Sequence, residues 1–257
     1  MIKLIDMGDI VKVTELTKVY DKRTVVDNIS FSVKKGEIFG ILGPNGAGKT
    51  TTLEMIETLR PIDGGTVIVD NINVAKDPEA VKYVIGVQPQ TPSFQDKTKV
   101  YETLQLFAAA YGGKVDVQEL LKEVELDKFT NSYAETLSGG QKQRLSIAAA
   151  LVHSPKVFFL DEPTTGLDPQ ARRNLWDLVR YVRDKGMTVI MTTHYMDEAE
   201  LLCDRVAIMD NGKIIALDSP KILIEQLIGR GFKKARHVEQ ADLEDVFIDL
   251  TGKALRE

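Results

Sequence analysis

The chain has 257 residues, of which 43% are hydrophobic and 28% are charged, so it is long enough to bury a substantial core and is not wholly disordered. Its net charge of −5 at pH 7 argues against broad, non-specific binding of nucleic acid, and we expect no nucleic-acid partner. The single cysteine, Cys203, excludes a disulfide within the chain and favours a cytosolic address, and no stretch reaches the roughly twenty apolar residues of a membrane-spanning helix.

The first part of the chain has the pattern of strands followed by one helix. Apolar and polar residues alternate over 11–13 and 29–33, which predicts half-buried antiparallel strands. Residues 38–42 form a continuous apolar run, which is typical of a strand buried on both faces. A glycine-rich loop follows, and then a helical stretch at about 48–58 and a further strand at 66–69.

The middle of the chain, at about residues 90–155, changes from strand-like to helical spacing of apolar residues. Beyond it, helical stretches alternate with three apolar strands, at 157–160, 188–192 and 205–209. Such alternation predicts a parallel sheet covered by helices. The fold class is therefore α/β, with a mainly parallel sheet, an antiparallel β subdomain and an inserted α-helical subdomain. The glycine-rich loop after residue 42, which reads G-x-x-x-x-G-K-T, predicts a P-loop NTPase core. We assign residues 9–228 to this domain and 229–257 to a short C-terminal tail.

From residue 219 onward the sequence predicts two helical segments, at 219–228 and 241–251, the second of which is the terminal helix of the tail. A basic stretch from Arg230 to Arg236 joins them. This stretch could contact lipid headgroups or a partner, or it could be a solvated linker, which is the usual role of a run of charges.

A phosphate-binding loop is predicted at residues 43–50, which fit the pattern G-x-x-x-x-G-K-S/T between a buried strand and a helix. Glycines allow a tight loop whose backbone N–H groups converge on a phosphate, and the helix N-terminus adds its positive dipole end. Lys49 would reach the β- and γ-phosphates, and the Thr50 hydroxyl would bind Mg²⁺. The predicted nucleotide-binding residues of the loop are Gly43, Pro44, Asn45, Gly46, Ala47, Gly48, Lys49, Thr50 and Thr51.

Two acids, Asp161 and Glu162, end the apolar strand at 157–160. Asp161 would hold Mg²⁺ through a water molecule, as an acid at this point does in P-loop proteins. Glu162 is placed to orient or deprotonate the attacking water. Two acids at a strand end can also be a plain solvated terminus, but the preceding phosphate loop favours the catalytic interpretation.

Residues 137–141, Leu-Ser-Gly-Gly-Gln, match the signature motif of ATP-binding cassette (ABC) ATPases. The chain resembles this family over almost its whole length, which implies binding and hydrolysis of ATP with Mg²⁺. The resemblance also implies four further roles: adenine stacking by Tyr20, contact with Mg²⁺ or the attacking water by Gln90, a dimer-interface position for Asp168, and a γ-phosphate contact by His194.

Each of these four residues also has a simpler interpretation. Tyr20 could be a surface or core aromatic, Gln90 an ordinary loop residue, and His194 a core histidine. Asp168 could cap the helix that begins near Pro169, a role that does not exclude an interface role. The resemblance favours the functional role at all four positions.

The signature residues Leu137, Ser138, Gly139, Gly140 and Gln141 precede a helical run, so they form a second anion-binding helix N-terminus. The resemblance implies a head-to-tail dimer, either a homodimer or a heterodimer with a second ATP-binding subunit. In it, each signature loop closes on the γ-phosphate held by the partner. ATP would then join the two subunits and hydrolysis would release them, which converts chemistry into motion.

ABC cassettes serve as transporter subunits or as soluble ATPases, for example in iron–sulfur cluster assembly and other remodelling. This chain lacks the long coiled coils of DNA-repair relatives and the second cassette of ribosome-acting relatives, which favours transport. Residues 241–252 are similar to the terminus of daunorubicin-type drug-export cassettes, which favours export. We therefore expect a peripheral protein on the cytoplasmic face of the cell membrane, bound to separately encoded transmembrane permease subunits.

The loop at 91–97 is a candidate coupling surface, because it follows Gln90 and has an exposed composition with one large aromatic, Phe94. Phe94 could merely cover its own helix. Alternatively, Phe94 and Tyr101 could contribute to a groove that receives a short helix of the membrane subunit.

Overall fold

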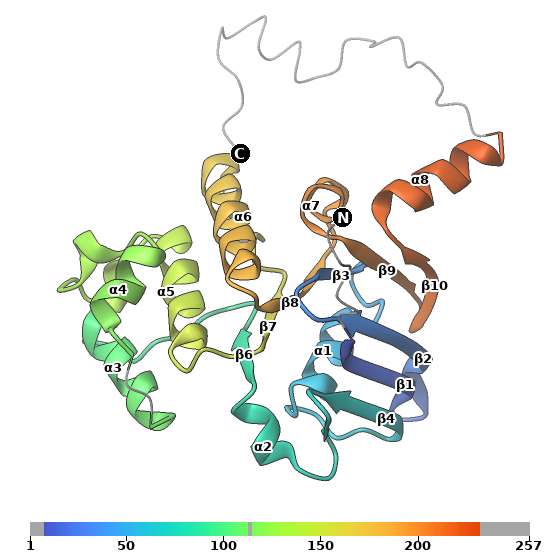
Figure 1. The fold of residues 1–257 in the computed structure, drawn as a ribbon, viewed down its shortest axis with the longest axis horizontal. Helices are drawn as coiled ribbons and strands as arrows, with labels where there is room; N and C mark the ends of the chain where they lie inside the picture. The colour runs from blue at the N-terminus through green and yellow to red at the C-terminus, as the bar shows by residue number, and fades with distance from the viewer. Residues whose placement is uncertain (1–7, 113–114, 232–257) are drawn as a thin grey trace, which may run out of the picture. The chain divides into compact units, whose positions relative to one another are not determined.

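The computed structural model describes residues 8–112 and 115–231, which form alternating strands and helices (Figure 1). The chain divides into one unit that ends at Leu223 and a second that begins at Ile224. Each parallel strand of the first unit is connected to the next through helices, as expected for an α/β protein.

The larger sheet has six strands in the order β10-β9-β3-β8-β7-β6. The strands are β3 (Ile38–Leu42), β6 (Ile85–Gln88), β7 (Val157–Asp161), β8 (Thr188–Thr193), β9 (Arg205–Asp210) and β10 (Lys213–Asp218). All neighbouring pairs are parallel except β9 and β10. Every residue of β3, β7 and β8 is buried, which explains their continuous apolar sequences and confirms the predicted parallel sheet.

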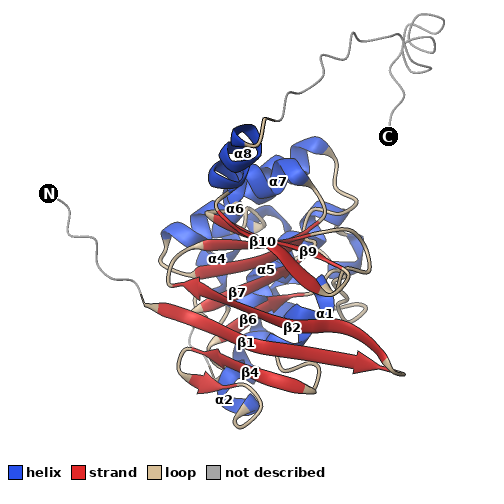
Figure 2. Cartoon of the chain, turned by 90° about the vertical axis from the view of Figure 1, so that its right-hand side faces the viewer, coloured by secondary structure: helices blue, strands red, loops and turns tan. Residues whose placement is uncertain are grey.

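The smaller sheet is antiparallel and has the order β2-β1-β4-β5. Its strands are β1 (Asp9–Tyr20), β2 (Arg23–Lys34), β4 (Gly64–Val69) and β5 (Ile72–Asn73). Val13 lies opposite Phe31 on one neighbour and Val67 on the other, and all three side chains are buried. The predicted antiparallel β subdomain is confirmed. Figure 2 shows β1, β2 and β4 on one side of the larger sheet and helices α6 and α7 on the other.

Eight α-helices lie in the described residues. They are α1 (Lys49–Ile56), α2 (Pro78–Lys82), α3 (Val100–Ala110), α4 (Val117–Glu123), α5 (Gly139–Leu151), α6 (Pro169–Asp184), α7 (Met196–Leu202) and α8 (Pro220–Gly229). Helices α3, α4 and α5 gather beside the larger sheet, where they form the predicted helical insert (Figure 1). Within residues 8–112 and 115–231, none of the helices combines the length and hydropathy that a bilayer crossing requires.

Strands β5, β6 and β10 and helix α2 escaped the sequence prediction. Strand β6 is short and contains Gly86 and Gln88, so its apolar signal is weak; β5 and α2 have only two and five residues, and no residue of β10 is fully buried. The predicted helix at 219–228 corresponds to α8. The expected helix at 241–251 and most of the basic stretch 230–236 lie outside the described residues, and the predicted domain boundary after residue 228 stays a prediction.

The two faces of β7 contribute to different cores. Phe158 and Leu160 pack with the helices of the insert and with α6 and α7, whereas Val157 and Phe159 pack with the smaller sheet and α1. This arrangement follows from the alternation of side chains along a strand. The larger sheet therefore packs against the helical insert on one face and against the antiparallel sheet on the other, and it fixes the position of each relative to the other.

Gly40 of β3 packs against Cys203 so closely that a Cβ atom would lie 2.7 Å from Cys203 Sγ and 3.2 Å from Val206 Cγ1. We expect Gly40→Ala to lower the free energy of unfolding by about 1–3 kcal/mol, because overpacking forces a shift of buried atoms. Adding Cys203→Ala removes the closest atom and should restore part of the loss in denaturant titrations. Strictly additive losses in the double variant would contradict the assigned contact.

Candidate functional site

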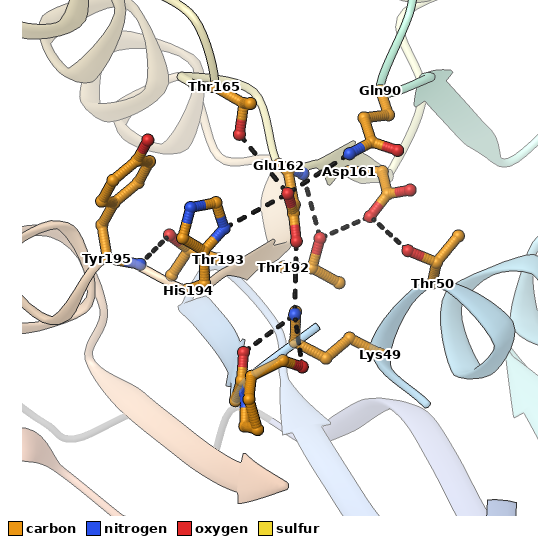
Figure 3. A network of polar contacts seen from close by, with 12 residues as sticks. Lys49, Thr50, Gln90, Asp161, Glu162, Thr165, Thr192, Thr193, His194 and Tyr195 are labelled. Carbon is orange, nitrogen blue, oxygen red and sulfur yellow. Dashed lines mark hydrogen bonds and ion pairs between the residues drawn. The ribbon is translucent and has the colours of Figure 1, made fainter. Parts of the chain in front are cut away.

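The predicted phosphate loop and the predicted catalytic side chains lie at the carboxyl edge of the larger sheet. The loop leaves β3, Gln90 follows β6, the acid pair ends β7 and His194 follows β8. Because these four strands are parallel, their carboxyl ends meet at one edge, where open α/β sheets bind their ligands. Residues distant in sequence are thereby brought together (Figure 3).

The phosphate loop depends on glycine at two positions. A Cβ atom on Gly43 would lie 2.1 Å from the carbonyl oxygen of Met209. Gly48 has a φ of 101°, and a Cβ atom there would lie 2.7 Å from the carbonyl oxygen of Val25. The loop thus packs against the backbone of its neighbours, and this close approach fixes its path into α1.

Lys49, the first residue of α1, is only 4% exposed and has three oxygen partners. Its Nζ atom donates to the carbonyl oxygens of Gly43 at 2.8 Å and Pro44 at 3.1 Å, and lies 3.2 Å from Glu162 Oε1. A buried ammonium group needs hydrogen-bond acceptors or a counter-ion to replace the water that it loses on burial. The loop therefore holds a fixed positive charge, which suits the binding of a phosphate group.

Asp161, at the end of β7, accepts hydrogen bonds from two hydroxyl groups. Thr192 Oγ1 donates to its carboxylate at 2.5 Å and Thr50 Oγ1 donates at 3.2 Å. Burial raises the pKa of Asp161 above its usual value, although the two hydroxyl groups act in the opposite direction. A cation bound nearby would favour the ionised form of this carboxyl group.

Glu162 is 7% exposed and has a φ of 45°, an uncommon value for a residue that is not glycine. Its carboxylate lies 3.2 Å from His194 Nδ1 and accepts from Gln90 Nε2 at 3.3 Å (Figure 3). Burial acts to raise the pKa of Glu162, but the hydrogen bond and charge of Lys49, with the contribution of His194, outweigh it and lower the pKa. Glu162 is thus ionised at neutral pH, as a general base must be.

The site is a cavity of about 520 Å³. Nine of the residues predicted for it line its wall: Asn45, Gly46, Gly48, Lys49, Thr50, Thr51, Gln90, Glu162 and His194. Thr165 and Val25 also line it, and neither was singled out in the sequence. Thr165 Oγ1 donates to Glu162 at 3.4 Å, and Thr192 binds both acids from the next strand. No sequence motif marks these threonines as site residues. Only Thr192 could have been indicated by the sequence, through its position at the end of an apolar strand.

Two predicted groups lie apart from this cavity. Tyr20 is 36% exposed at the end of β1, and its hydroxyl accepts from Arg60 Nη1 at 3.1 Å. The signature residues 137–141 begin α5, where Ser138 caps the helix by accepting from Gln141 N at 3.4 Å. Neither group is among the residues that line the cavity. The functional roles of both therefore stay predictions.

Asp168 is the N-cap of α6. Its carboxylate accepts from the backbone N–H groups of Gln170 at 3.0 Å and Ala171 at 2.8 Å. The capping interpretation of this residue is thereby confirmed. The interface role stays a prediction, since capping leaves one carboxylate oxygen available to a partner.

The residues at the loop fit Mg²⁺ when it is bound together with a nucleotide. Thr50 Oγ1 and Asp161 Oδ1 lie 3.2 Å apart and are hard oxygen ligands of the kind that Mg²⁺ prefers. In the described part of the chain, no group of three or more His, Cys, Asp or Glu side chains could hold a metal ion. The protein would therefore supply few ligands, and water and phosphate oxygens would supply the rest, as is usual for Mg²⁺ at phosphates.

The glycine loop, the buried lysine and the acid pair at one sheet edge define a P-loop nucleotide-binding protein. The sequence profile described as "ABC transporter" matches residues 26–165. The linearmycin resistance ATP-binding protein of Bacillus subtilis is 42% identical over 219 residues, which are 83% of this chain and 70% of that protein. The chain belongs to the ABC transporter family.

Further relatives and solved structures support the same family assignment. The Nod factor export ATP-binding protein I of Burkholderia pseudomallei is 42% identical over 84% of this chain and 72% of its own length. The structure of an ATP-binding subunit of an ABC transporter has a TM-score of 0.77 at 29% identity, covering 94% of this chain and 99% of its own. A dimeric ATP-binding cassette in a post-hydrolysis state with ADP and Pi has a TM-score of 0.73 at 28% identity, covering 81% and 98%.

Thr192 joins the two acids, since its hydroxyl donates to Asp161 and accepts from the backbone N–H of Glu162 at 3.0 Å. We expect Thr192→Val to lower the free energy of unfolding by about 1–3 kcal/mol, because it leaves buried polar groups without partners. Thr66→Val, at an exposed position of β4, is the matched control and should change stability by less than about 0.5 kcal/mol. Equal effects in thermal or chemical denaturation would contradict the role of the Thr192 hydroxyl.

Proposed function

We propose that this chain powers export by hydrolysing ATP at the phosphate-loop site and passing the resulting motion to separate membrane-spanning subunits. That it is an ATP-binding ABC ATPase follows from its family. The observation that carries the proposal is the placement of an ionised Glu162 beside Lys49, Gln90 and His194 in the phosphate-loop cavity.

The phosphate loop and Lys49 bind the nucleotide phosphates in this proposal. Glu162 orients a water molecule and accepts its proton as the water attacks the γ-phosphorus. His194 and Gln90 border the same carboxylate, so they hold the attacking water and respond to the presence of the γ-phosphate. Thr50 and Gln90, with Asp161 through water, would hold Mg²⁺, which would neutralise charge that develops on the phosphate oxygens.

Two subunits are needed to complete each site. The signature loop 137–141 is absent from the wall of the cavity of its own chain, and Ser138 and Gly139 are exposed. We assign this loop to the γ-phosphate held by a second subunit, which is a copy of this chain or a second ATP-binding subunit. Asp168 then lies at the interface, with its backbone partners in α6 holding the loop in place.

Tyr20 is assigned to the adenine ring. Its ring is partly exposed and lies beside two cations, with Lys18 Nζ 5.2 Å and Arg60 Cζ 5.8 Å from the ring centroid. These contacts hold the ring at the end of β1 while leaving surface for stacking.

The export assignment rests on relatives. The names of two relatives refer to linearmycin resistance and Nod factor export, and both proteins match most of this chain. The soluble alternative, iron–sulfur cluster assembly or other remodelling, is not favoured by these names. We place the chain as a peripheral protein on the cytoplasmic face of the cell membrane, bound to permease subunits encoded separately.

The test of the catalytic assignment is Glu162→Gln, which keeps the shape of the side chain but removes the base. We expect normal binding of ATP with Mg²⁺ and hydrolysis at least about a hundredfold slower. Lys49→Ala should instead lose nucleotide affinity, and Glu54→Gln, on α1 outside the cavity, should retain both properties. A Glu162→Gln protein that hydrolyses ATP at a near-normal rate would remove this residue from the central role.

The dimer assignment predicts that Glu162→Gln is largely monomeric without nucleotide and doubles its mass with ATP, because hydrolysis no longer separates the subunits. Light scattering or sedimentation measures the change. Adding Gly140→Asp, which places a carboxylate in the signature loop, should prevent dimerisation by repelling the phosphate. An unchanged mass with ATP at high protein concentration would count against the dimer.

A further inference from the structure

A fully buried carboxyl group lies outside the nucleotide cavity. Glu198, in the first turn of α7, is 0% exposed and is not among the residues that line that cavity. Its Oε1 atom accepts a hydrogen bond from the indole Nε1 of Trp176 in α6 at 2.9 Å. Its Oε2 atom is also buried, and it has no partner with hydrogen-bond geometry in the part of the chain that the structure describes. Neither Glu198 nor Trp176 takes part in the proposed hydrolysis.

The groups around Glu198 come from segments that carry the catalytic side chains. Burial raises the pKa of Glu198, and four neighbouring side chains oppose this rise: Thr193, Trp176, Thr164 and Arg172. The first of these directly precedes His194 at the end of β8, and Thr164 lies in the loop that follows Glu162. The other two belong to α6. The end of β8, the loop after β7 and α6 therefore meet at this one carboxyl group.

Two of these groups also hold the residues on either side of His194. Thr193 Oγ1 accepts from the backbone N–H of Tyr195 at 3.0 Å, and this hydrogen bond spans His194 (Figure 3). The rings of His194 and Tyr195 lie 4.1 Å apart between centroids, and Arg172 Cζ lies 4.5 Å from the centroid of the Tyr195 ring. Thr193 and Arg172 both interact with Glu198. The turn that carries His194 is thus held by two groups that depend on the same carboxyl group.

Stability alone does not explain a buried acid at this position. Burying a carboxyl group is costly, and apolar side chains of similar volume are often at least as stable as a buried polar pair. Glu198 Oε2, Thr164 Oγ1 and Arg172 Nε are all buried without a hydrogen-bond partner among residues 8–112 and 115–231. An acid whose neighbours stay incompletely paired contributes little to stability. This favours a role in placing the side chains around it.

We propose that Glu198, together with Trp176, is a positioning residue for ATP hydrolysis, which fixes the turn that holds His194 against the carboxylate of Glu162. The proposal rests on the proposed function, which gives His194 its contact with the γ-phosphate. His194 Nδ1 lies 3.2 Å from Glu162 Oε2, so a small rotation of the turn would separate the two groups. Misplacing a catalytic group by about 1 Å can lower a rate by about a hundredfold. The phosphate loop does not depend on this turn, so nucleotide binding stays intact.

Steady-state kinetics of ATP hydrolysis by the full chain test this role. We expect Glu198→Met, which keeps the length of the side chain but removes both oxygens, to lower kcat at least about tenfold with little change in KM. Glu198→Gln keeps an acceptor for the Trp176 indole and should recover part of the loss. Glu200→Met makes the same change at an exposed position of α7 and should leave kcat unchanged. A Glu198→Met protein with normal kcat would overturn the proposal.

A combined variant keeps the test valid if Glu198→Met does not fold. Glu198→Met with Trp176→Phe removes both members of the buried hydrogen bond, so neither is left unpaired, and the free energy of unfolding should return toward that of the unchanged chain. We expect kcat to stay low even so, because the apolar pair no longer holds Thr193 and Arg172. If kcat recovers together with stability, the role of Glu198 is purely structural and the proposal is wrong.

A double-variant cycle with His194→Ala tests whether Glu198 acts through His194. In the His194→Ala background, Glu198→Met should lower kcat no further, because the group that it positions is gone. A further loss of about tenfold would overturn the proposal, since independent effects multiply. If His194→Ala alone hydrolyses ATP at the normal rate, the proposed role of His194 fails and this proposal fails with it. If His194→Ala is slow and Glu198→Met is not, only the positioning role fails.

Discussion

The parallel pairing of β3 with β8, and of β8 with β7, is the constraint on which the nucleotide site depends. It places the phosphate loop, the acid pair and His194 at one sheet edge, although they are far apart in the sequence. The side chains of these strands are buried in two hydrophobic cores, one on each face of the sheet, and this packing fixes the positions of the strand ends. The position of each functional side chain is thus a consequence of packing in the middle of the sheet, where no functional residue lies.

The pKa values of the two acids at the end of β7 are shifted in opposite directions because their surroundings differ. Burial raises the pKa of Asp161 against the opposing effect of the Thr192 and Thr50 hydroxyl groups, whereas Lys49 and His194 lower the pKa of Glu162. One carboxylate is thereby suited to a site that a cation completes, and the other to accepting a proton. Thr192 connects them, so the geometry of the pair is set from the neighbouring strand.

The loop after β6 lies between the nucleotide cavity and a second cavity, of about 340 Å³, whose wall contains Glu57. Gln90 reaches the catalytic carboxylate on one side, and Pro92 and Phe94 line the other cavity. A change in the position of Gln90 would therefore alter the wall of the second cavity through a few residues of backbone. This short stretch of backbone connects the walls of the two cavities.

The sequence by itself determined the phosphate loop, the acid pair, the signature motif and the alternation of strands and helices, because each is a local pattern with a local physical cause. The tertiary structure alone decided that Thr192 supports Glu162 and that β6 pairs with β7 in the larger sheet. It also brought Glu57 and His153 to one cavity. These contacts join strands and helices that are distant in the chain, so no spacing of residues along the sequence encodes them.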